Sequence, residues 1–391
     1  MTRQLLSLSV ALTVQCFLPF GHALLTGLKF SVSDVAAGSI KYVIATFPTF
    51  GQINYMKLPD PSWRPLLPSK GLVEPKAICV DIRNKRLYVA DPAAGMVYWY
   101  QLLVMPDFRL LSDGRKRLAV ANVAADGLAI DGLGNLYVAG RTHAAVSVEG
   151  IFKQDVKTIE KTLPKAPRSI WTGGNARLLF PNGTVNTLAS PVLFQPGSVA
   201  VSAFQIYWGN KLLPVNGTVL VQANIGGPPP APSPAVMASS FIIQERYAAM
   251  HNGAMRPITD AVPGIMGIAL TPTSLLYATK GGVYGINLND VPKGCGANNI
   301  LCPLVAEASD PTGMVWDGDG TIYVADRMAG AVFSFPAGAM SKQTLVKASD
   351  AKGVFSVALF ETSAARQLGR CAVILAIVVN SVTTWASAAA V

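Results

Sequence analysis

Few residues of this chain could support catalysis or zinc binding. The 391 residues include three histidines, and one of them lies in the apolar N-terminal segment, which leaves His143 and His251. Zinc sites combine several His, Cys or carboxylate ligands, whereas these two histidines stand far apart in the sequence. The chain contains no Gly-x-Ser-x-Gly nucleophile motif and no phosphate-binding glycine loop. The remaining candidates are carboxylates and lysines whose positions are set by an internal repeat.

A short phrase recurs along the chain and predicts its architecture. An apolar stretch, a turn and a strand centred on tyrosine follow one another in residues 126–139 and 312–326, with weaker copies at 76–91, 197–208 and 266–278. Each copy predicts a β-hairpin. The central tyrosines are residues 42, 88, 137, 207, 277 and 323, at intervals of 46, 49, 70, 70 and 46. A four-stranded propeller blade takes roughly 40 to 50 residues, so two repeats carry insertions.

The repeats therefore predict an all-β fold, a β-propeller of four-stranded blades. We expect six blades; seven is the alternative, because residues 168–171 and 177–180 could form one more hairpin. Over residues 26–360 the chain resembles the six-bladed propellers of the NHL-repeat and gluconolactonase-like (senescence-marker) superfamily, through the phrases given above. We also expect residues 353–360 to pair beside residues 40–46 and so complete the first blade.

The resemblance implies where a metal ion would bind. Gluconolactonase-like propellers hold a divalent ion at the centre of one end of the ring, through side chains that precede the innermost strands, and Asp126 occupies such a position. A calcium-like ion requires several oxygen ligands. The matching positions in the other copies are Lys76, Gly197, Met266, Thr312 and Lys352. One carboxylate, two lysines and three neutral residues do not make a calcium cage.

We therefore predict a ligand-binding lining of Lys76, Asp126, Thr312 and Lys352, which suits an anionic ligand better than a metal. The leading functional prediction is a non-catalytic binding module without a cofactor, whose partner is a protein or an acidic glycan. The alternative is a metal-dependent lactonase or esterase-like hydrolase that uses Asp126 as a ligand for calcium or another divalent ion.

The net charge of +10 favours anionic partners. The densest basic clusters are residues 115–117 and the lysine series from Lys153 to Arg168. Neither cluster has interleaved aromatic residues for base stacking, so we predict no nucleic-acid partner. An ordinary solvated face, with Asp155 and Glu160 interspersed, is the alternative interpretation of the lysine series.

The two ends of the chain predict the secretory pathway and a membrane attachment. Residues 1–23 are typical of a cleaved signal peptide, with an uncleaved anchor as the alternative, and residues 24–360 would form the propeller. In the hydrophobic tail, residues 361–391, the segment Cys371–Val391 has no charged residue. It predicts a glycolipid-anchor signal, with a plain membrane helix or a packed end as alternatives. We expect an extracellular or cell-surface protein.

Cysteines and sequons agree with that compartment. Cys295 and Cys302 bracket a short loop and predict a disulfide, with two free thiols as the alternative. Asn182 and Asn216 each begin an Asn-Gly-Thr sequon and are predicted glycosylation sites. Both sequons also read as hairpin turns. Cys79 falls in an apolar strand, where a small core residue is expected.

Overall fold

The computed structural model describes residues 39–67, 71–143, 149–161, 177–181, 195–202, 205–211, 218–224, 256–260, 264–290, 302–338 and 340–363. Residues Lys41–Phe360 form one compact unit. The predicted signal peptide, the tail beyond residue 363, Cys295, His251 and both sequon asparagines lie outside the described residues, so the corresponding expectations stay predictions. No helix in these ranges is long and apolar enough to cross a membrane.

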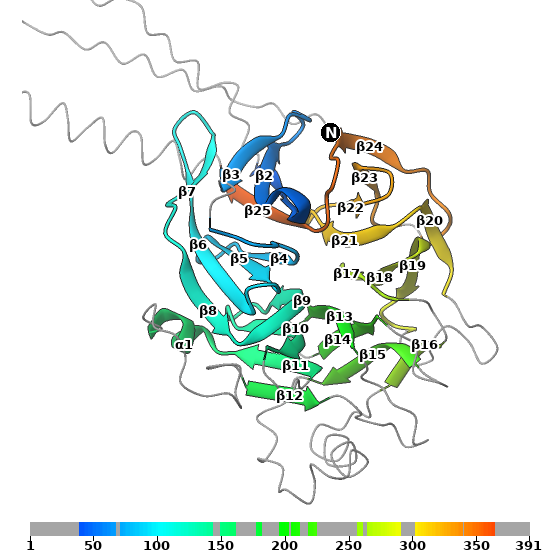
Figure 1. The fold of residues 1–391 in the computed structure, drawn as a ribbon. Helices are drawn as coiled ribbons and strands as arrows, with labels where there is room; N and C mark the ends of the chain where they lie inside the picture. Colours follow the sequence, from blue (N-terminus) through cyan, green and yellow to red (C-terminus); the bar gives the residue numbers. More distant parts are fainter. Residues whose placement is uncertain are drawn as a thin grey trace, which may run out of the picture. The chain divides into compact units, whose positions relative to one another are not determined.

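The described strands form antiparallel sheets arranged around a common centre, which is a β-propeller (Figure 1). Five sheets have four strands. In order from the centre outward, the first contains β25 (Val357–Ser363), β1 (Ser39–Phe47), β2 (Gln52–Lys57) and β3 (Arg64–Leu67). The others contain β9 (Val123–Ile130), β10 (Leu136–Thr142), β11 (Glu149–Gln154) and β12 (Arg177–Pro181); β13 (Pro196–Val201), β14 (Gln205–Asn210), β15 (Thr218–Asn224) and β16 (Arg256–Asp260); β17 (Gly267–Leu270), β18 (Ser274–Thr279), β19 (Gly281–Asn287) and β20 (Leu304–Ala308); and β21 (Pro311–Trp316), β22 (Thr321–Asp326), β23 (Ala331–Pro336) and β24 (Val346–Asp350).

The remaining sheet has five strands. It contains β4 (Ile78–Asp81), β5 (Arg86–Asp91), β6 (Met96–Val104) and β7 (Leu110–Ser112), and β8 (Arg117–Ala121) also pairs with β6. The only helical elements among the described residues are a 3-10 turn at Pro48–Phe50 and the short helix α1 (Val156–Lys161). Residues 177–181 are β12, the outer strand of the β9 sheet, and not half of a separate hairpin.

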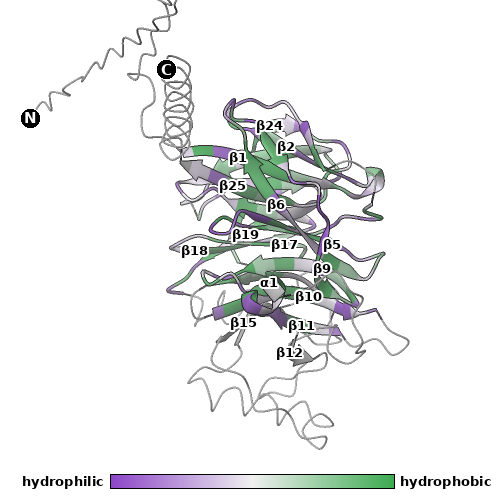
Figure 2. Ribbon diagram, turned by 90° about the vertical axis from the view of Figure 1, so that its left-hand side faces the viewer, coloured by the Kyte–Doolittle hydropathy of each residue, from purple (hydrophilic) through white to green (hydrophobic). Residues whose placement is uncertain are grey.

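The repeated tyrosines all lie in the second strand from the centre. Tyr42, Tyr88, Tyr137, Tyr207, Tyr277 and Tyr323 belong to β1, β5, β10, β14, β18 and β22, and none is more than 9% exposed. The core lies between neighbouring sheets: Tyr88 packs in one cluster with Leu128, and Val43 in another with Tyr323. Figure 2 shows hydrophobic residues along strands such as β1, β2 and β6.

The innermost strands approach each other closely, which explains the glycine of the repeated phrase. A methyl group at Gly127 would lie 2.7 Å from Ser198 Cα, and one at Gly313 would lie 2.8 Å from Ser356 Cα. A methyl group at Gly267 would lie 3.3 Å from Gly313 Cα. A side chain at these positions would force neighbouring sheets apart.

Residues near the two ends of the described chain pair with each other. Thr46 donates its N–H to the Ser356 carbonyl at 3.0 Å, and the Phe355 N–H donates to the Thr46 carbonyl at 3.0 Å. The rings of Tyr42 and Phe360 lie 6.0 Å apart, so β25 runs antiparallel to β1. The expected pairing of residues 353–360 beside 40–46 is therefore present, with the strand itself beginning at Val357.

Candidate ligand-binding site

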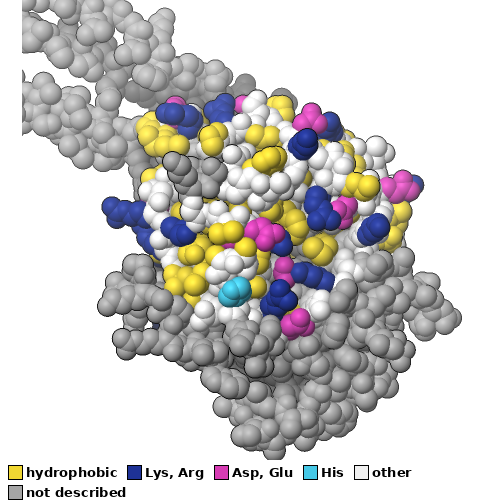
Figure 3. Space-filling model, in the orientation of Figure 1, with side chains coloured by type: hydrophobic (Ala, Val, Ile, Leu, Met, Phe, Trp, Pro, Cys, Tyr) yellow, Lys and Arg dark blue, Asp and Glu magenta, His cyan; other side chains and the backbone are white. Residues whose placement is uncertain are grey.

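A pocket of about 400 Å³ opens at the end of the ring where the innermost strands β4, β9 and β13 begin, which we call the pocket end. Figure 3 shows basic and acidic side chains interspersed near the centre of the ring. The ionisable residues that line the pocket are Glu74, Lys76, Asp126, Arg141, His143, Glu149 and Lys211.

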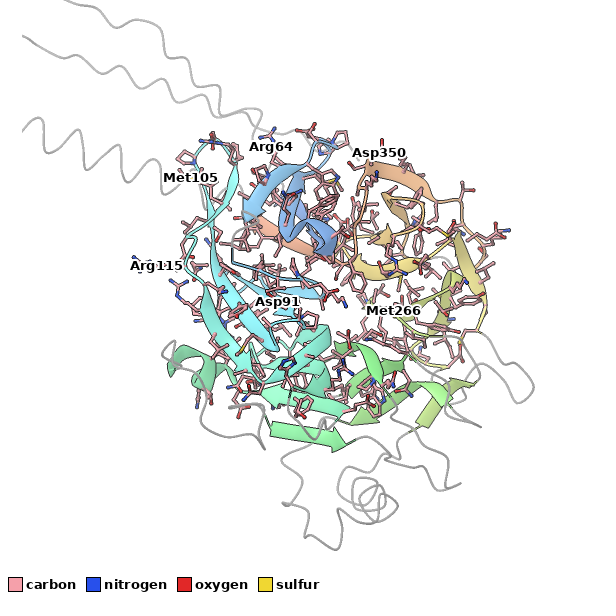
Figure 4. The ribbon with its side chains drawn as sticks, in the orientation of Figure 1. Arg64, Asp91, Met105, Arg115, Met266 and Asp350 are labelled. Atoms are coloured by element: carbon pink, nitrogen blue, oxygen red, sulfur yellow. The ribbon has the colours of Figure 1, made fainter. Side chains whose placement is uncertain are left out.

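A buried carboxylate builds the wall that carries Glu74 and Lys76. Asp91, at the end of β5, is fully buried and accepts the N–H groups of Val73 at 2.7 Å and Glu74 at 3.0 Å. The Lys76 N–H donates to the Ala90 carbonyl at 2.9 Å. In Figure 4, Asp91 lies close to the centre of the ring. The loop that enters β4 is thus fixed by hydrogen bonds to β5, and both side chains start from a defined backbone.

The carboxylate of Asp126 is in direct contact with a lysine of the neighbouring sheet. Lys211 Nζ lies 2.5 Å from Asp126 Oδ2, and the two side chains are 27% and 22% exposed. Lys211, which follows β14, donates its N–H to the Gln195 carbonyl at 2.8 Å. A methyl group at Gly197 would lie 2.6 Å from Lys211 Cγ. The lysine therefore crosses the space that a side chain at position 197 would fill.

The other charges of the pocket are also opposed. Lys76 Nζ lies 3.0 Å from Glu74 Oε1, and Arg141 on β10 is the cross-strand partner of Glu149 on β11. Three basic and three acidic side chains line the pocket when His143 is neutral, so their formal charges cancel. The pocket offers both signs of charge, where the sequence predicted a mainly cationic lining.

Two of the four predicted lining residues meet here and two do not. Lys76 and Asp126 line the same pocket. Thr312 is 2% exposed, and its hydroxyl donates to the Phe355 carbonyl at 2.5 Å, so it joins β21 to the segment that leads into β25. Lys352 is exposed in the turn before β25. Gly127 contacts Ser198, the residue at the equivalent position of the next sheet, and Gly313 contacts Ser356 in the same way. Ser356 is therefore equivalent to Gly127. In the β25 sheet the residue that matches Asp126 is thus Phe355 and not Lys352.

Among the described residues, no group of three or more His, Cys, Asp or Glu side chains is placed to hold a metal ion. Met266, which matches Asp126 in its own sheet, lies near the centre of the ring in Figure 4. Cys79 packs in the core, where burial and the nearby Asp81 raise the pKa of its thiol.

The predicted basic cluster at residues 115–117 is largely used for packing. Lys116 Nζ donates to the Gly71 carbonyl at 2.5 Å and lies 4.2 Å from the centre of the Tyr98 ring. Arg117 donates to Asp113 at 2.6 Å and stacks 4.5 Å above Trp99. Arg115 is exposed. These cations stabilise the five-stranded sheet.

Lys211 was missed by sequence reasoning, and the reason is physical. It follows the second strand of its sheet, whereas Asp126 lies within β9, the innermost strand of another sheet, and not before it as the sequence predicted, so no local spacing relates the two residues. The only signal was Gly197, which stands where other copies have a side chain. By comparison with the other repeats, Gly197 looked like a position that lacks a ligand. In the structure this glycine provides the room that the Lys211 side chain occupies.

Comparisons with known proteins support the fold. No protein-family model and no curated protein matches the chain. Among solved structures, a chain in the crystal structure of a nidogen/laminin complex is similar, with a TM-score of 0.52, 12% identity and coverage of 82% of this chain and 98% of that one. A gluconolactonase from Xanthomonas campestris has a TM-score of 0.42 and 14% identity, over 72% of this chain and 78% of that one. The first similarity agrees with a β-propeller.

Proposed function

We propose that this protein is a non-catalytic recognition propeller that binds a partner protein at the pocket end. The observation that carries the proposal is the combination, at this end, of opposed charges with exposed apolar side chains. Phe50 is 51% exposed, Val73 66% and Met328 77%. Apolar side chains next to polar, charged ones are typical of protein interfaces.

These three apolar residues extend from the pocket around one side of the ring. Val73 lies next to Glu74 in the loop that forms the pocket wall. Phe50 is on the neighbouring sheet, where a methyl group at Gly353 would lie 3.3 Å from its ring. Met328 is in the β22–β23 turn of the next sheet, and Gly330 of that turn approaches Lys352. A partner could thus contact an apolar arc and the charged pocket together.

A protein partner fits the charges better than an acidic glycan does. Acidic glycans require an excess of positive charge, and the formal charges of the pocket cancel. A protein surface carries both signs and can pair with both. A similar propeller is present in the crystal structure of a nidogen/laminin complex, which is a protein assembly.

The alternative, a metal-dependent hydrolase, would require Lys211 to leave Asp126. A divalent ion and an ammonium group compete for the same carboxylate oxygen, and the ion needs several further oxygen ligands. The 2.5 Å contact between Lys211 and Asp126 instead satisfies the carboxylate within the protein. No observation in the described part of the chain favours hydrolysis over binding.

We further propose that the sheets are six blades of a ring, related to the NHL-repeat and gluconolactonase-like propellers. Pairing of β25 with β1 supports closure, since it places a C-terminal innermost strand beside an N-terminal one. The matching tyrosines support repetition of one unit. Each sheet would then contribute one innermost strand to the centre.

Secretion and attachment through the tail are also part of the proposal. The innermost strands run from the pocket end to the opposite end, and β25 is one of them. Phe360 and Lys41 therefore lie away from the pocket, where Lys41 contacts Asp317 in the β21–β22 turn at 3.1 Å. An anchor that follows β25 would leave the pocket end free for a partner.

Site-specific photo-crosslinking in cells tests the proposal. A photoreactive amino acid at Met328 of the full chain should form a discrete adduct with a protein, and the same group at Leu133, at the opposite end, serves as the control. Asp126→Lys alone and Lys211→Glu alone each reverse one charge of the pocket and should weaken the adduct. The double variant, which exchanges the two charges, should restore part of the adduct yield. Equal adducts from both positions, or lactone turnover lost on Asp126→Ala, would contradict the proposal.

A further inference from the structure

Two neighbouring turns at the end opposite the pocket present apolar tips. The β4–β5 turn contains Ile82, which is 47% exposed, and the β9–β10 turn contains Leu133, which is 70% exposed. The turns touch: a methyl group at Gly134 would lie 3.2 Å from Asp81 Oδ2 and 3.3 Å from Asn84 Nδ2. The two tips therefore belong to one continuous surface.

The backbone of both turns is held by its own carboxylates. Asp81 accepts the Asn84 N–H at 3.0 Å and the Asn84 side-chain amide at 2.7 Å. Asp131 accepts the N–H groups of Leu133 and Asn135, each at 2.9 Å. The turns are therefore ordered while their apolar tips face solvent, and the carboxylates are engaged inward.

Basic side chains surround these tips. Arg83 and Lys157 are exposed and Lys85 is half-buried. Lys157 belongs to α1, whose first residue, Val156, lies 3.2 Å from a methyl group placed at Gly134. The exposed carboxylate nearby, Asp155, lies 3.6 Å from Lys153. We call Ile82, Arg83, Leu133 and Lys157 the turn patch.

The turn patch lies at the end of the ring from which the chain continues into its hydrophobic tail. Two contacts identify that end. Lys41 on β1 contacts Asp317 in the β21–β22 turn, and Phe360 on β25 packs against Tyr42 on β1. Beyond residue 363 the sequence has Arg366 and Arg370 and then the uncharged segment Cys371–Val391. Attachment to a bilayer through this segment would tether the propeller at the same end as the turn patch.

We propose that the turn patch contacts the surface of a lipid bilayer. Ile82 and Leu133 would enter the interface between headgroups and acyl chains, and Arg83 and Lys157 would meet lipid phosphates. Apolar residues flanked by Lys and Arg are the combination that favours such interfaces. The contact goes beyond the proposed function, which requires attachment but no lipid contact by the propeller itself.

Fluorescence on vesicles tests this contact. The full chain carries an added C-terminal His-tag and is bound to vesicles of phosphatidylcholine and phosphatidylserine that contain a nickel-chelating lipid. An environment-sensitive fluorescent amino acid replaces Leu133, or Met328 as the matched control at the pocket end. A spin-labelled lipid should quench the probe at 133 about twofold or more and leave the probe at 328 nearly unchanged.

A second variant separates lipid contact from simple proximity. Arg83→Glu combined with Lys157→Glu should return the emission at 133 to its lipid-free value, because each basic residue contributes roughly fivefold to binding at an anionic surface. Equal quenching at 133 and 328, or no quenching at 133, would overturn the proposal. The His-tag imposes attachment, so a failure of the natural tail would appear separately, as loss of flotation of the untagged chain with nickel-free vesicles.

Discussion

Lys211 Nζ lies 2.5 Å from Asp126 Oδ2, and the two residues come from neighbouring sheets of the propeller. The pair occupies the position at which the resemblance to gluconolactonase-like propellers implied a metal ligand. An ammonium group there neutralises the carboxylate without any cofactor. The same contact helps to join the β9 and β13 sheets at the pocket end.

The Asp126–Lys211 pair should contribute measurably to stability. Because both side chains are partly buried, a double-mutant cycle with Asp126→Asn and Lys211→Met should give a coupling energy of about 1 kcal/mol in urea unfolding. The control is the Lys342–Glu307 pair, in which Lys342 Nζ lies 2.6 Å from Glu307 Oε1 but the two side chains are 60% and 65% exposed. Its coupling should be near zero, and a larger value there than at Asp126 would contradict this interpretation.

Thr46 should be important for joining the two ends of the propeller chain. Its hydroxyl donates to the Lys76 carbonyl at 2.7 Å and accepts the Ser356 N–H at 3.0 Å. Thr46→Val keeps the shape and leaves two backbone groups without this partner, so the free energy of unfolding should fall by about 2 kcal/mol. Thr46→Ser keeps the hydroxyl and should recover most of the loss. Equal effects of the two substitutions would show that packing, and not hydrogen bonding, dominates.

Gly127 should tolerate no side chain. Gly127→Ala would place a methyl group 2.7 Å from Ser198 Cα, and such overpacking costs about 1 to 3 kcal/mol. Gly132→Ala is the matched control, because a methyl group at that position meets nothing within 4 Å. Thermal unfolding should show a clear decrease in Tm for the first variant alone. An unchanged Tm for Gly127→Ala would mean that the innermost strands are not in tight contact.

Stability should decrease in acid through Asp317. Burial by itself raises the pKa of this carboxyl. A side-chain hydrogen bond with Asp319 and hydrogen bonds from the N–H groups of Thr321, Asp319 and Gly320 outweigh burial and hold the pKa well below its ordinary value of 3.8. A lowered folded-state pKa stabilises the fold above the unfolded-state pKa, and this stabilisation is lost as pH falls through the folded-state pKa.

Asp317→Asn should therefore cost about 2 kcal/mol at pH 7, where the ion pair with Lys41 is also lost, and the difference from the wild type should shrink below about pH 4. Chemical unfolding between pH 2 and pH 7 measures both. Asp350→Asn, at a carboxylate that is 84% exposed, is the control and should have little effect at any pH. A difference for Asp317→Asn that grew in acid would reverse the assigned sign.

Much of the fold could be predicted because the repeat encodes it locally. A tyrosine flanked by apolar residues marks the second strand, and the glycine in the innermost strand reflects contacts such as that of Gly127 with Ser198. The residue that matches Asp126 in the β25 sheet was predicted wrongly as Lys352, because Ser356, just before β25, stands where three other copies have Gly127, Gly267 and Gly313. Ser is small enough for the same contact, but glycine was the sequence signal.

The site was less predictable because it is built from contacts between sheets. Asp91 holds the pocket wall through the N–H groups of Val73 and Glu74, which neither composition nor spacing reveals. Arg117 and Lys116 read as a basic surface in the sequence, yet both stack on aromatic rings. Charges in the sequence indicate partners only when the fold leaves them unpaired.

Calorimetric titration of the full chain with calcium, magnesium and zinc tests the central claim most directly, with the same sample then assayed on a panel of lactones and esters. We predict no saturable metal binding at the pocket, no turnover, and identical titrations for the wild type and Asp126→Ala. Tight metal binding that is lost in Asp126→Ala and accompanies turnover would contradict a recognition propeller and identify a metal-dependent hydrolase.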